Sequence, residues 1–219
     1  MDDKYTSFGS ARTMAGAVLI GFIVAFIGLL ALTGSGGSTA QQQLSTSTLL
    51  VLPEPREIGY FELIDHAGQP FTLDHLQDKW SLVFFGFSHC PDICPNTLYE
   101  MRGIKEAFSI KHPGQAKRLQ IVFISVDPER DRPSDLEQYV RYFDPDFIGV
   151  TGTDEQIAPL ARQLGIAYKI ENHLPGEKRY DIEHTASVLL SDPQGRIHGV
   201  FPAPHESARM TSDLVKVIR

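Results

Sequence analysis

Two short runs of apolar residues, separated by a more polar segment, constrain the fold of this chain more than any other feature. Residues 81–87 read SLVFFGF and residues 119–126 read LQIVFISV. Runs of this length and composition are typical of strands that are buried on both faces of a sheet. Because the segment between them is long enough for a helix, the pattern predicts two parallel strands joined by a crossover helix.

Further patterns on both sides of these runs extend the alternation of strands and helices. Alternating apolar and polar residues around turn-forming ones predict hairpins, and capping-box sequences predict the first turns of helices. The predicted hairpins cover residues 57–73 and 187–201, a third strand covers 147–150, and helices cover 95–110, 134–143, 153–165 and the end of the chain from about 206. This order predicts a layered α/β fold, in which sites usually lie at the carboxyl ends of strands.

The N-terminal part of the chain differs from the rest. Residues 14–32, MAGAVLIGFIVAFIGLLAL, carry no charge and approach the roughly 20 residues that cross a bilayer. A signal peptide cleaved near Ala40 is the alternative, but its apolar core would have only about 7–15 residues. We therefore predict a retained transmembrane helix over 14–32, a flexible Gly/Ser/Thr/Gln linker over 33–49 and a folded domain over 50–219.

The distribution of basic residues predicts the orientation of that helix. Lys4 and Arg12 lie within residues 1–13, and no Lys or Arg follows the apolar stretch until Arg56. The positive-inside rule then places residues 1–13 in the cytoplasm and the folded domain in the periplasm, where thiols tend to be oxidised. The predicted location is that of a single-pass protein in a bacterial inner membrane.

The charge and the cysteine count exclude several classes of function. A net charge of -7 without a basic patch argues against a nucleic-acid partner. Two cysteines are too few for a disulfide-stabilised scaffold or an all-cysteine zinc site. Both of them, Cys90 and Cys94, lie in SHCPDICPNTL directly after the first apolar run. Three roles remain for this pair: a structural disulfide, a redox couple or a metal clamp.

A disulfide and a redox couple each fit this turn incompletely. A disulfide between Cys90 and Cys94 would close a very short loop and add little stability. A redox role is favoured by the position at a helix N-terminus, which lowers the pKa of a thiol. However, the familiar redox motif has two residues between its cysteines, and three stand here. Thioredoxin-like oxidoreductases also carry a cis-proline loop that faces the cysteines, and the corresponding residues 181–187 include no proline.

A metal clamp is the third role. The spacing places both sulfurs on one side of a helical turn, and two thiolates favour copper(I) among the common metals. Such a clamp needs a further ligand, for which His184 is the candidate because it lies in the segment that would face the cysteines. A lone histidine before a strand is more often a hydrogen-bonded structural residue, so both interpretations of His184 stay open.

Four motifs spread along the chain carry a resemblance to a known family. They are FGFSHCPDICPNTL, FISVDPERDRPSDLEQYV, VTGT and DIEHTASVLLSDPQGRI. Together they resemble the Sco/SenC family of copper chaperones, from about Pro53 to the C-terminus and in the right order. The family is also similar in its arrangement of an N-terminal anchor, a tether and a thioredoxin-like domain.

The resemblance implies a fold, a metal and a set of site residues. It implies a three-layer thioredoxin-like α/β fold with an N-terminal β-hairpin, and one copper ion held by Cys90, Cys94 and His184. It also implies that Asp127 matches an acidic position near the site, although an ordinary turn acid is the alternative. His89 is not expected to bind copper, since adjacent residues of a tight turn tend to point apart.

The resemblance further implies a function. Proteins of this family take copper from a donor, help to build the dinuclear copper centre of cytochrome c oxidase subunit II, and turn over no substrate. Some members are credited instead with reducing the cysteines of that subunit. Both roles require Cys90 and Cys94, whereas only copper binding clearly requires His184. A thiol-disulfide oxidoreductase therefore stays open as the alternative to a membrane-anchored copper chaperone.

Overall fold

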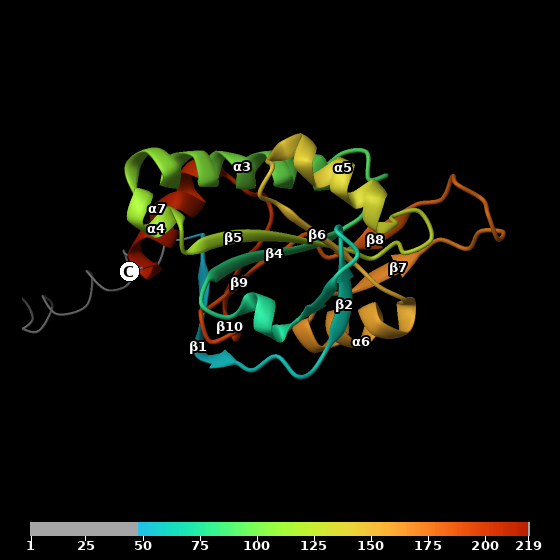
Figure 1. Cartoon of the computed structure of the whole chain (residues 1–219), viewed down its shortest axis with the longest axis horizontal. Coiled ribbons are helices and arrows are strands. Elements are labelled where there is room, and N and C mark those ends of the chain that lie inside the picture. Colours follow the sequence, from blue (N-terminus) through green and yellow to red (C-terminus); the bar gives the residue numbers. More distant parts are fainter. Residues whose placement is uncertain (1–47, 219) are drawn as a thin grey trace, which may run out of the picture. The chain divides into compact units, whose positions relative to one another are not determined.

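A mixed eight-stranded sheet forms the centre of the described part of the chain, which is residues 48–218 of a computed structural model (Figure 1). Its strands lie in the order β1-β10-β9-β4-β5-β6-β2-β3, and β7 and β8 form a separate two-stranded sheet. The strands are β1 (Leu50–Arg56), β2 (Glu62–Asp65), β3 (Pro70–Thr72), β4 (Trp80–Gly86), β5 (Leu119–Ser125), β6 (Ile148–Thr151), β7 (Tyr168–Ile170), β8 (Ile182–His184), β9 (Val188–Ser191) and β10 (Ile197–Phe201). The helices are η1 (Leu73–Leu76), α3 (Ile93–Lys111), α4 (Pro113–Ala116), α5 (Pro133–Phe143), α6 (Asp154–Leu164) and α7 (Ser207–Val217).

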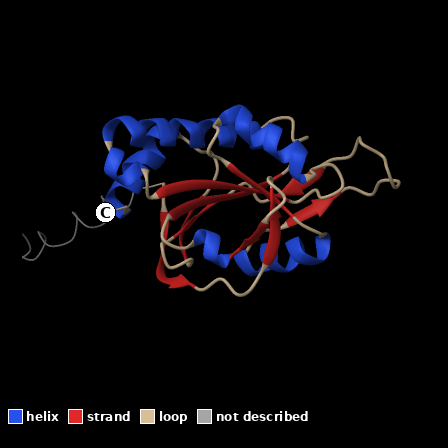
Figure 2. Ribbon diagram, in the orientation of Figure 1, coloured by secondary structure: helices blue, strands red, loops and turns tan. Residues whose placement is uncertain are grey.

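Helices cover both faces of the large sheet. Figure 2 shows α3, α5 and α7 on one face and α6 on the opposite face, which makes three layers. β4 and β5 are parallel neighbours, with Trp80 opposite Leu119 and Gly86 opposite Ser125, and α3 connects them. The predicted pair of parallel strands with a crossover helix is therefore confirmed. The hairpin predicted before this pair is formed by β2 and β3, which extend the sheet beyond β6.

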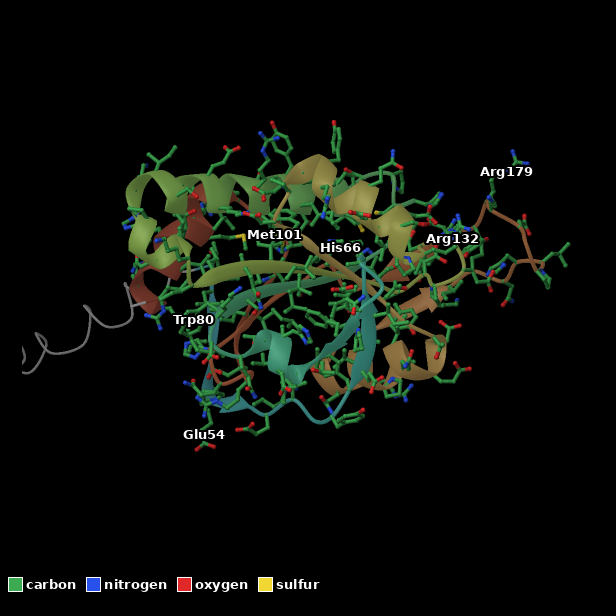
Figure 3. The ribbon with its side chains drawn as sticks, viewed as in Figure 1. Glu54, His66, Trp80, Met101, Arg132 and Arg179 are labelled. Atoms are coloured by element: carbon green, nitrogen blue, oxygen red, sulfur yellow. The ribbon has the colours of Figure 1, made fainter. Side chains whose placement is uncertain are left out.

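The core lies between these layers and is rich in phenylalanine. All residues of β4 are buried, and Met101 points from α3 toward the sheet, where it is fully buried (Figure 3). Large aromatic side chains supply much of the apolar surface that a core removes from water. The almost completely buried phenylalanines are Phe71, Phe84, Phe85, Phe87, Phe108, Phe123, Phe147 and Phe201.

The helix boundaries agree with the predictions only in part. α6 has the predicted capping box at Thr153 and ends at Gly165, whose φ of 74° is left-handed. α5 begins at Pro133 rather than at the predicted capping box, because the fixed φ of proline suits the first helical position. α3 begins at Ile93, two residues before the predicted start, and this places Cys94 in its first turn.

Three strands were absent from the prediction. β1 contains Pro53 and Pro55, which argue against a strand, but it lies at the edge of the sheet and pairs only with β10, where proline is tolerated. β7 and β8 have three residues each, which is too short for an alternating pattern to be recognised. One of these short strands carries His184.

The last helix, α7, forms hydrogen bonds with the first described residues, Thr48 and Leu49. Asp213 of α7 has a side chain that is only 6% exposed. Its Oδ2 accepts hydrogen bonds from the backbone N–H of Thr48 at 2.7 Å, from Thr48 Oγ1 at 3.0 Å and from the N–H of Leu49 at 3.2 Å. The two ends of the domain are thereby joined, and both lie at the left in Figure 1.

The predicted location in a bacterial inner membrane, with a cytoplasmic N-terminus and a periplasmic domain, is wrong. Within residues 48–218, no helix is both long and apolar enough to cross a membrane. The longest, α3, has 19 residues but includes charged side chains such as Arg102, Lys105 and Glu106. The apolar stretch 14–32, on which the transmembrane helix was predicted, lies outside the described residues.

Candidate metal centre

The two cysteines lie where β4 passes into α3. Cys90 is 8% exposed and precedes the helix, whereas Cys94 is fully buried in the first helical turn. The backbone N–H of Cys94 donates a hydrogen bond to Cys90 Sγ at 3.4 Å. The sulfur of Cys90 thus accepts from one of the N–H groups that are left free at a helix N-terminus. Both thiols are free rather than joined in a disulfide.

Gly86, the last residue of β4, provides the space for the buried sulfur. A Cβ atom placed on Gly86 would lie 2.7 Å from Cys94 Sγ and 2.9 Å from the ring of Phe123. Contacts this short are not found for real Cβ atoms. Only glycine at this position therefore lets the first turn of α3 pack against the sheet with Cys94 beneath it.

His184 approaches the cysteines from the two-stranded sheet. It is the last residue of β8, pairs with Tyr168 of β7, and has its Nε2 3.3 Å from Cys94 Sγ. Its Nδ1 lies 3.1 Å from the carbonyl oxygen of Thr185. Because a carbonyl can only accept, Nδ1 carries the proton and Nε2 presents its lone pair to the cysteines.

Aromatic side chains enclose the imidazole. The rings of Phe84 and Phe87 stand edge-on to His184, each with its centroid 5.9 Å from that of the imidazole. Both phenylalanines are almost completely buried. They exclude water from the inner side of the site and leave the imidazole with few alternative positions.

The three side chains form a group that could hold one metal ion. The sulfur of Cys90, the sulfur of Cys94 and a ring nitrogen of His184 all lie within 4.8 Å of one another. Two thiolates and one imidazole are soft to intermediate donors, and no carboxylate belongs to the group, so the set suits copper(I) better than magnesium or calcium. The structure therefore brings together the three residues that the resemblance implied.

The thiol pair shares one proton unequally. A hydrogen bond from the Cys94 thiol, assisted by one from the backbone N–H of Cys94, lowers the pKa of Cys90 to about 4. The same contact with the Cys90 sulfur, together with burial, raises the pKa of Cys94 above its ordinary value. The metal-free site therefore contains a Cys90 thiolate and a protonated Cys94 at neutral pH.

We expect alkylation of the reduced, metal-free protein to be confined to Cys90 and to depend little on pH between about 6 and 8. An ordinary thiol, with a pKa of about 8.5, is mostly protonated over that range. The Cys90 thiolate is lost only as the pH falls through about 4. Timed iodoacetamide labelling with peptide mass spectrometry measures both rates. A Cys90 rate that drops in proportion to hydroxide below about pH 8, or equal labelling of Cys94, would contradict the proton sharing.

An open depression gives access to part of the site. It has a volume of about 380 Å³ and is lined by Cys90, Asp92, Ile93, Asp181, Glu183 and His184, among others. Cys90 and His184 thus face a surface that a partner can reach, whereas Cys94 lies beneath them. The carboxylates make the rim of this depression acidic.

Residues near the cysteines in sequence do not join the group. His89 is exposed, and its Nδ1 lies 3.0 Å from Ser88 Oγ, as expected for a residue that points away from the metal donors. Asp92 is exposed and accepts a hydrogen bond from Asn96. Neither side chain is placed to bind the same ion as the sulfurs.

Asp127 lies close to the site but does not touch the three donors. It is 1% exposed, and its carboxylate accepts hydrogen bonds from the hydroxyl of Tyr180 at 2.6 Å and from Arg130 Nε. Arg130, Tyr180 and the fully buried Asp131 were not predicted as site residues. The only signal was a cluster of charges directly after a buried strand, and that pattern is equally typical of a solvated turn.

A comparison with protein-family models decides the family. The model described as SCO1/SenC matches residues 52–219. The chain belongs to the SCO1/SenC family. The resemblance noted in the sequence is thereby confirmed over nearly the whole described domain.

Named relatives of this SCO1/SenC protein come from bacteria and eukaryotes. A protein of Stutzerimonas stutzeri that is named as copper-binding is 38% identical over 161 residues, which cover 74% of this chain and 76% of that protein. The SCO2-like protein of Rickettsia felis is 39% identical over 140 residues, which cover 63% of this chain and 65% of that protein. The chain thus spans slightly less than two thirds of the Rickettsia protein.

Solved structures of the family share the fold. Arabidopsis thaliana ScoI, solved with copper bound, gives a TM-score of 0.67 at 33% identity and covers 74% of this chain and 99% of that one. Apo Sco1 from Thermus thermophilus gives a TM-score of 0.68 at 32% identity and covers 78% of this chain and 96% of that one. The expected thioredoxin-like α/β class is confirmed. Copper is bound in several of these neighbours, including yeast Sco1, and the Cys-Cys-His group of this chain could bind it.

Proposed function

We propose that this chain binds one copper ion through Cys90, Cys94 and His184 and delivers it during the assembly of cytochrome c oxidase. The proposal assigns copper binding to the domain of residues 50–219. The hydrogen bond between Nδ1 of His184 and the carbonyl of Thr185 is the observation that carries it, because it leaves Nε2 free beside Cys94 Sγ. Membership in the SCO1/SenC family and the copper bound in the Arabidopsis relative also support it.

The proposed partners are a copper donor protein and an acceptor, which is subunit II of the oxidase. Copper is the cargo of this reaction, and no substrate is converted. Cys90 and His184 line the open depression, so thiolates or imidazoles of a docked acceptor can replace these two ligands first. Cys94 lies deepest and would release the ion last. Each exchange keeps the ion coordinated, which avoids the cost of releasing copper(I) into water.

Anaerobic titration of the reduced full-length protein with copper(I), against a competing chelator, tests this function. We expect one equivalent to bind tightly, since the site has one set of soft donors. The double variant Cys90→Ser, Cys94→Ser retains only the imidazole and should lose this binding. If the parent competes no better than the double variant, the copper proposal is wrong.

The unequal sharing of the proton supports a second candidate, a thiol-disulfide oxidoreductase. The Cys90 thiolate would attack a disulfide of the oxidase subunit, form a mixed disulfide and release one substrate thiolate. Cys94, after losing its proton, would attack the Cys90 sulfur and release the second substrate thiol. The substrate disulfide is then reduced, and this protein holds a Cys90–Cys94 disulfide. This route does not need His184 as a metal ligand.

A further inference from the structure

One short segment between β5 and α5 contacts both parts of the chain that carry the metal donors. This segment, residues 127–131, follows the carboxyl end of β5. Its Asp131 bonds to Ser88, two residues before Cys90. Its Arg130 bonds to the backbone of Tyr180, which lies just before β8 and His184.

On the histidine side, Arg130 is the centre of a buried cluster. Its Nη1 donates to the carbonyl oxygens of Lys178 at 3.2 Å and Tyr180 at 2.9 Å, and its Nε donates to Asp127. Its guanidinium carbon lies 3.5 Å from the centroid of the Tyr180 ring. The ring of His173 is stacked on Tyr180 with its centroid 3.7 Å away. Two groups this close to one centroid must occupy opposite faces, so Arg130 and His173 enclose Tyr180 between them.

Asp131 bonds to the turn that leads to Cys90. Its Oδ2 accepts hydrogen bonds from the backbone N–H of Ser88 at 2.9 Å and from Ser125 Oγ at 2.6 Å, and its Oδ1 accepts one from Ser88 Oγ. Arg130 also lies near this turn, because its guanidinium carbon is 5.5 Å from the centroid of the Phe87 ring. Phe87 in turn contacts His184. The turn that carries the cysteines is therefore bonded to Asp131, and the approach to His184 is bonded to the adjacent Arg130.

Stability alone does not account for this arrangement. The side chains of Asp127 and Arg130 are 1% and 5% exposed, and Nη2 of Arg130 is buried with no hydrogen-bond partner among residues 48–218. A buried ion pair is often no more stabilising than apolar residues of similar volume, and an unpaired buried N–H is costly. What the cluster does provide is a fixed position for the strand that carries His184.

We propose that Asp127, Arg130 and Asp131 are positioning residues that set the separation between Cys94 Sγ and His184 Nε2. They do not touch the ion. Asp131 fixes the turn that carries Cys90, and the pair of Asp127 and Arg130 fixes the approach to His184 through Tyr180. Their effect on copper affinity rests on the proposed function, but their effect on the position of His184 is a property of the metal-free protein.

Two graded variants and one matched control test this role. Arg130→Lys keeps the charge but cannot form the planar set of bonds to Asp127 and the two carbonyls. Tyr180→Phe removes only the hydroxyl bond to Asp127 and keeps the ring stack, so it tests the cluster with little risk to folding. Arg132→Lys is the control, because Arg132 lies two residues away, is 74% exposed, and pairs only with Asp135 in the described residues (Figure 3).

Hydrogen exchange and NMR of the metal-free, full-length protein give the decisive readout. In Arg130→Lys we expect the backbone N–H groups of residues 182–185 to exchange about tenfold faster than in the parent, with a smaller increase in Tyr180→Phe. The ring nitrogens of His184 should change from one tautomer to a mixture. Arg132→Lys should match the parent. The free energy of unfolding in urea, measured alongside, separates local loosening from a general loss of stability.

Copper(I) titration of the same variants then extends the test to the proposed function. A roughly tenfold weaker affinity in Arg130→Lys, together with the exchange and tautomer changes, supports the positioning role. If the parent does not bind copper, the function fails while the measurements on the metal-free protein still decide the positioning. Unchanged exchange and an unchanged His184 tautomer in Arg130→Lys would overturn the positioning role whatever the copper result.

Discussion

Replacing His184 with alanine is expected to weaken copper(I) binding by more than about 100-fold, since changes to residues that merely support metal ligands already cost about 10–100-fold. The variant leaves two sulfurs, of which Cys94 is fully buried and holds its proton. Competition with a copper(I) chelator, under anaerobic and reducing conditions, measures the change. His89→Ala is the matched control, because His89 is next to Cys90 but lies outside the donor group.

The same pair of variants distinguishes the two candidate functions. A copper protein should lose its affinity in His184→Ala and keep it in His89→Ala. A thiol-disulfide oxidoreductase should reduce a partner disulfide in both variants and fail only when Cys90 or Cys94 is changed. Equal copper affinity in the parent and in His184→Ala, with both thiols essential for reduction, would therefore exclude the copper clamp and favour the redox function.

The second large effect is expected from Gly86→Ala. The added methyl group would lie 2.7 Å from Cys94 Sγ, so either the first turn of α3 or the sulfur must move. Overpacking of this kind costs typically about 1–3 kcal/mol of the free energy of unfolding. Because the displaced atom is a metal donor, we expect copper affinity to fall in the same variant. Urea unfolding and copper(I) titration measure the two effects separately.

Gly114→Ala is the matched control for this substitution. Gly114 lies in the short helix α4, and within the described part of the chain no atom beyond its own neighbours and helix backbone would come within 4 Å of the new Cβ. The change should leave the free energy of unfolding within about 0.5 kcal/mol, as for most surface substitutions. If Gly86→Ala behaves like Gly114→Ala in both measurements, then Gly86 is not needed to seat Cys94.

The parts of the fold that could be predicted are those with a local cause. β4 and β5 were recognisable because a strand buried on both faces needs a continuous apolar run. The end of α6 at Gly165 was recognisable because glycine adopts a positive φ without strain. β1 was missed because Pro53 and Pro55 argue against a strand, and only its place at the sheet edge makes them acceptable.

The metal donors of the site could be predicted from the sequence, but the buried residues that hold them in place could not. The cysteine pair is visible as a motif, and His184 was implied by the resemblance rather than by any local pattern. Arg130 could not be recognised, because its buried contacts are with the loop before β8, about fifty residues further along the chain. Asp131 could not be recognised either, because it bonds to Ser88 in the cysteine turn, 43 residues earlier in the chain. A carboxylate that ends a strand looks the same in sequence whether it faces water or joins a buried cluster.

The bonds between Asp213 and the residues at the start of the domain also determine how this protein can be handled. Thr48 is bonded to α7, which lies at the left in Figure 1, whereas β8, the strand that ends at His184, lies toward the right. A tag or solid support joined after α7 therefore attaches at the end of the domain away from β8. Immobilisation on an electrode or resin through the C-terminus would leave the copper-binding face directed toward solution, open to an acceptor or a reductant.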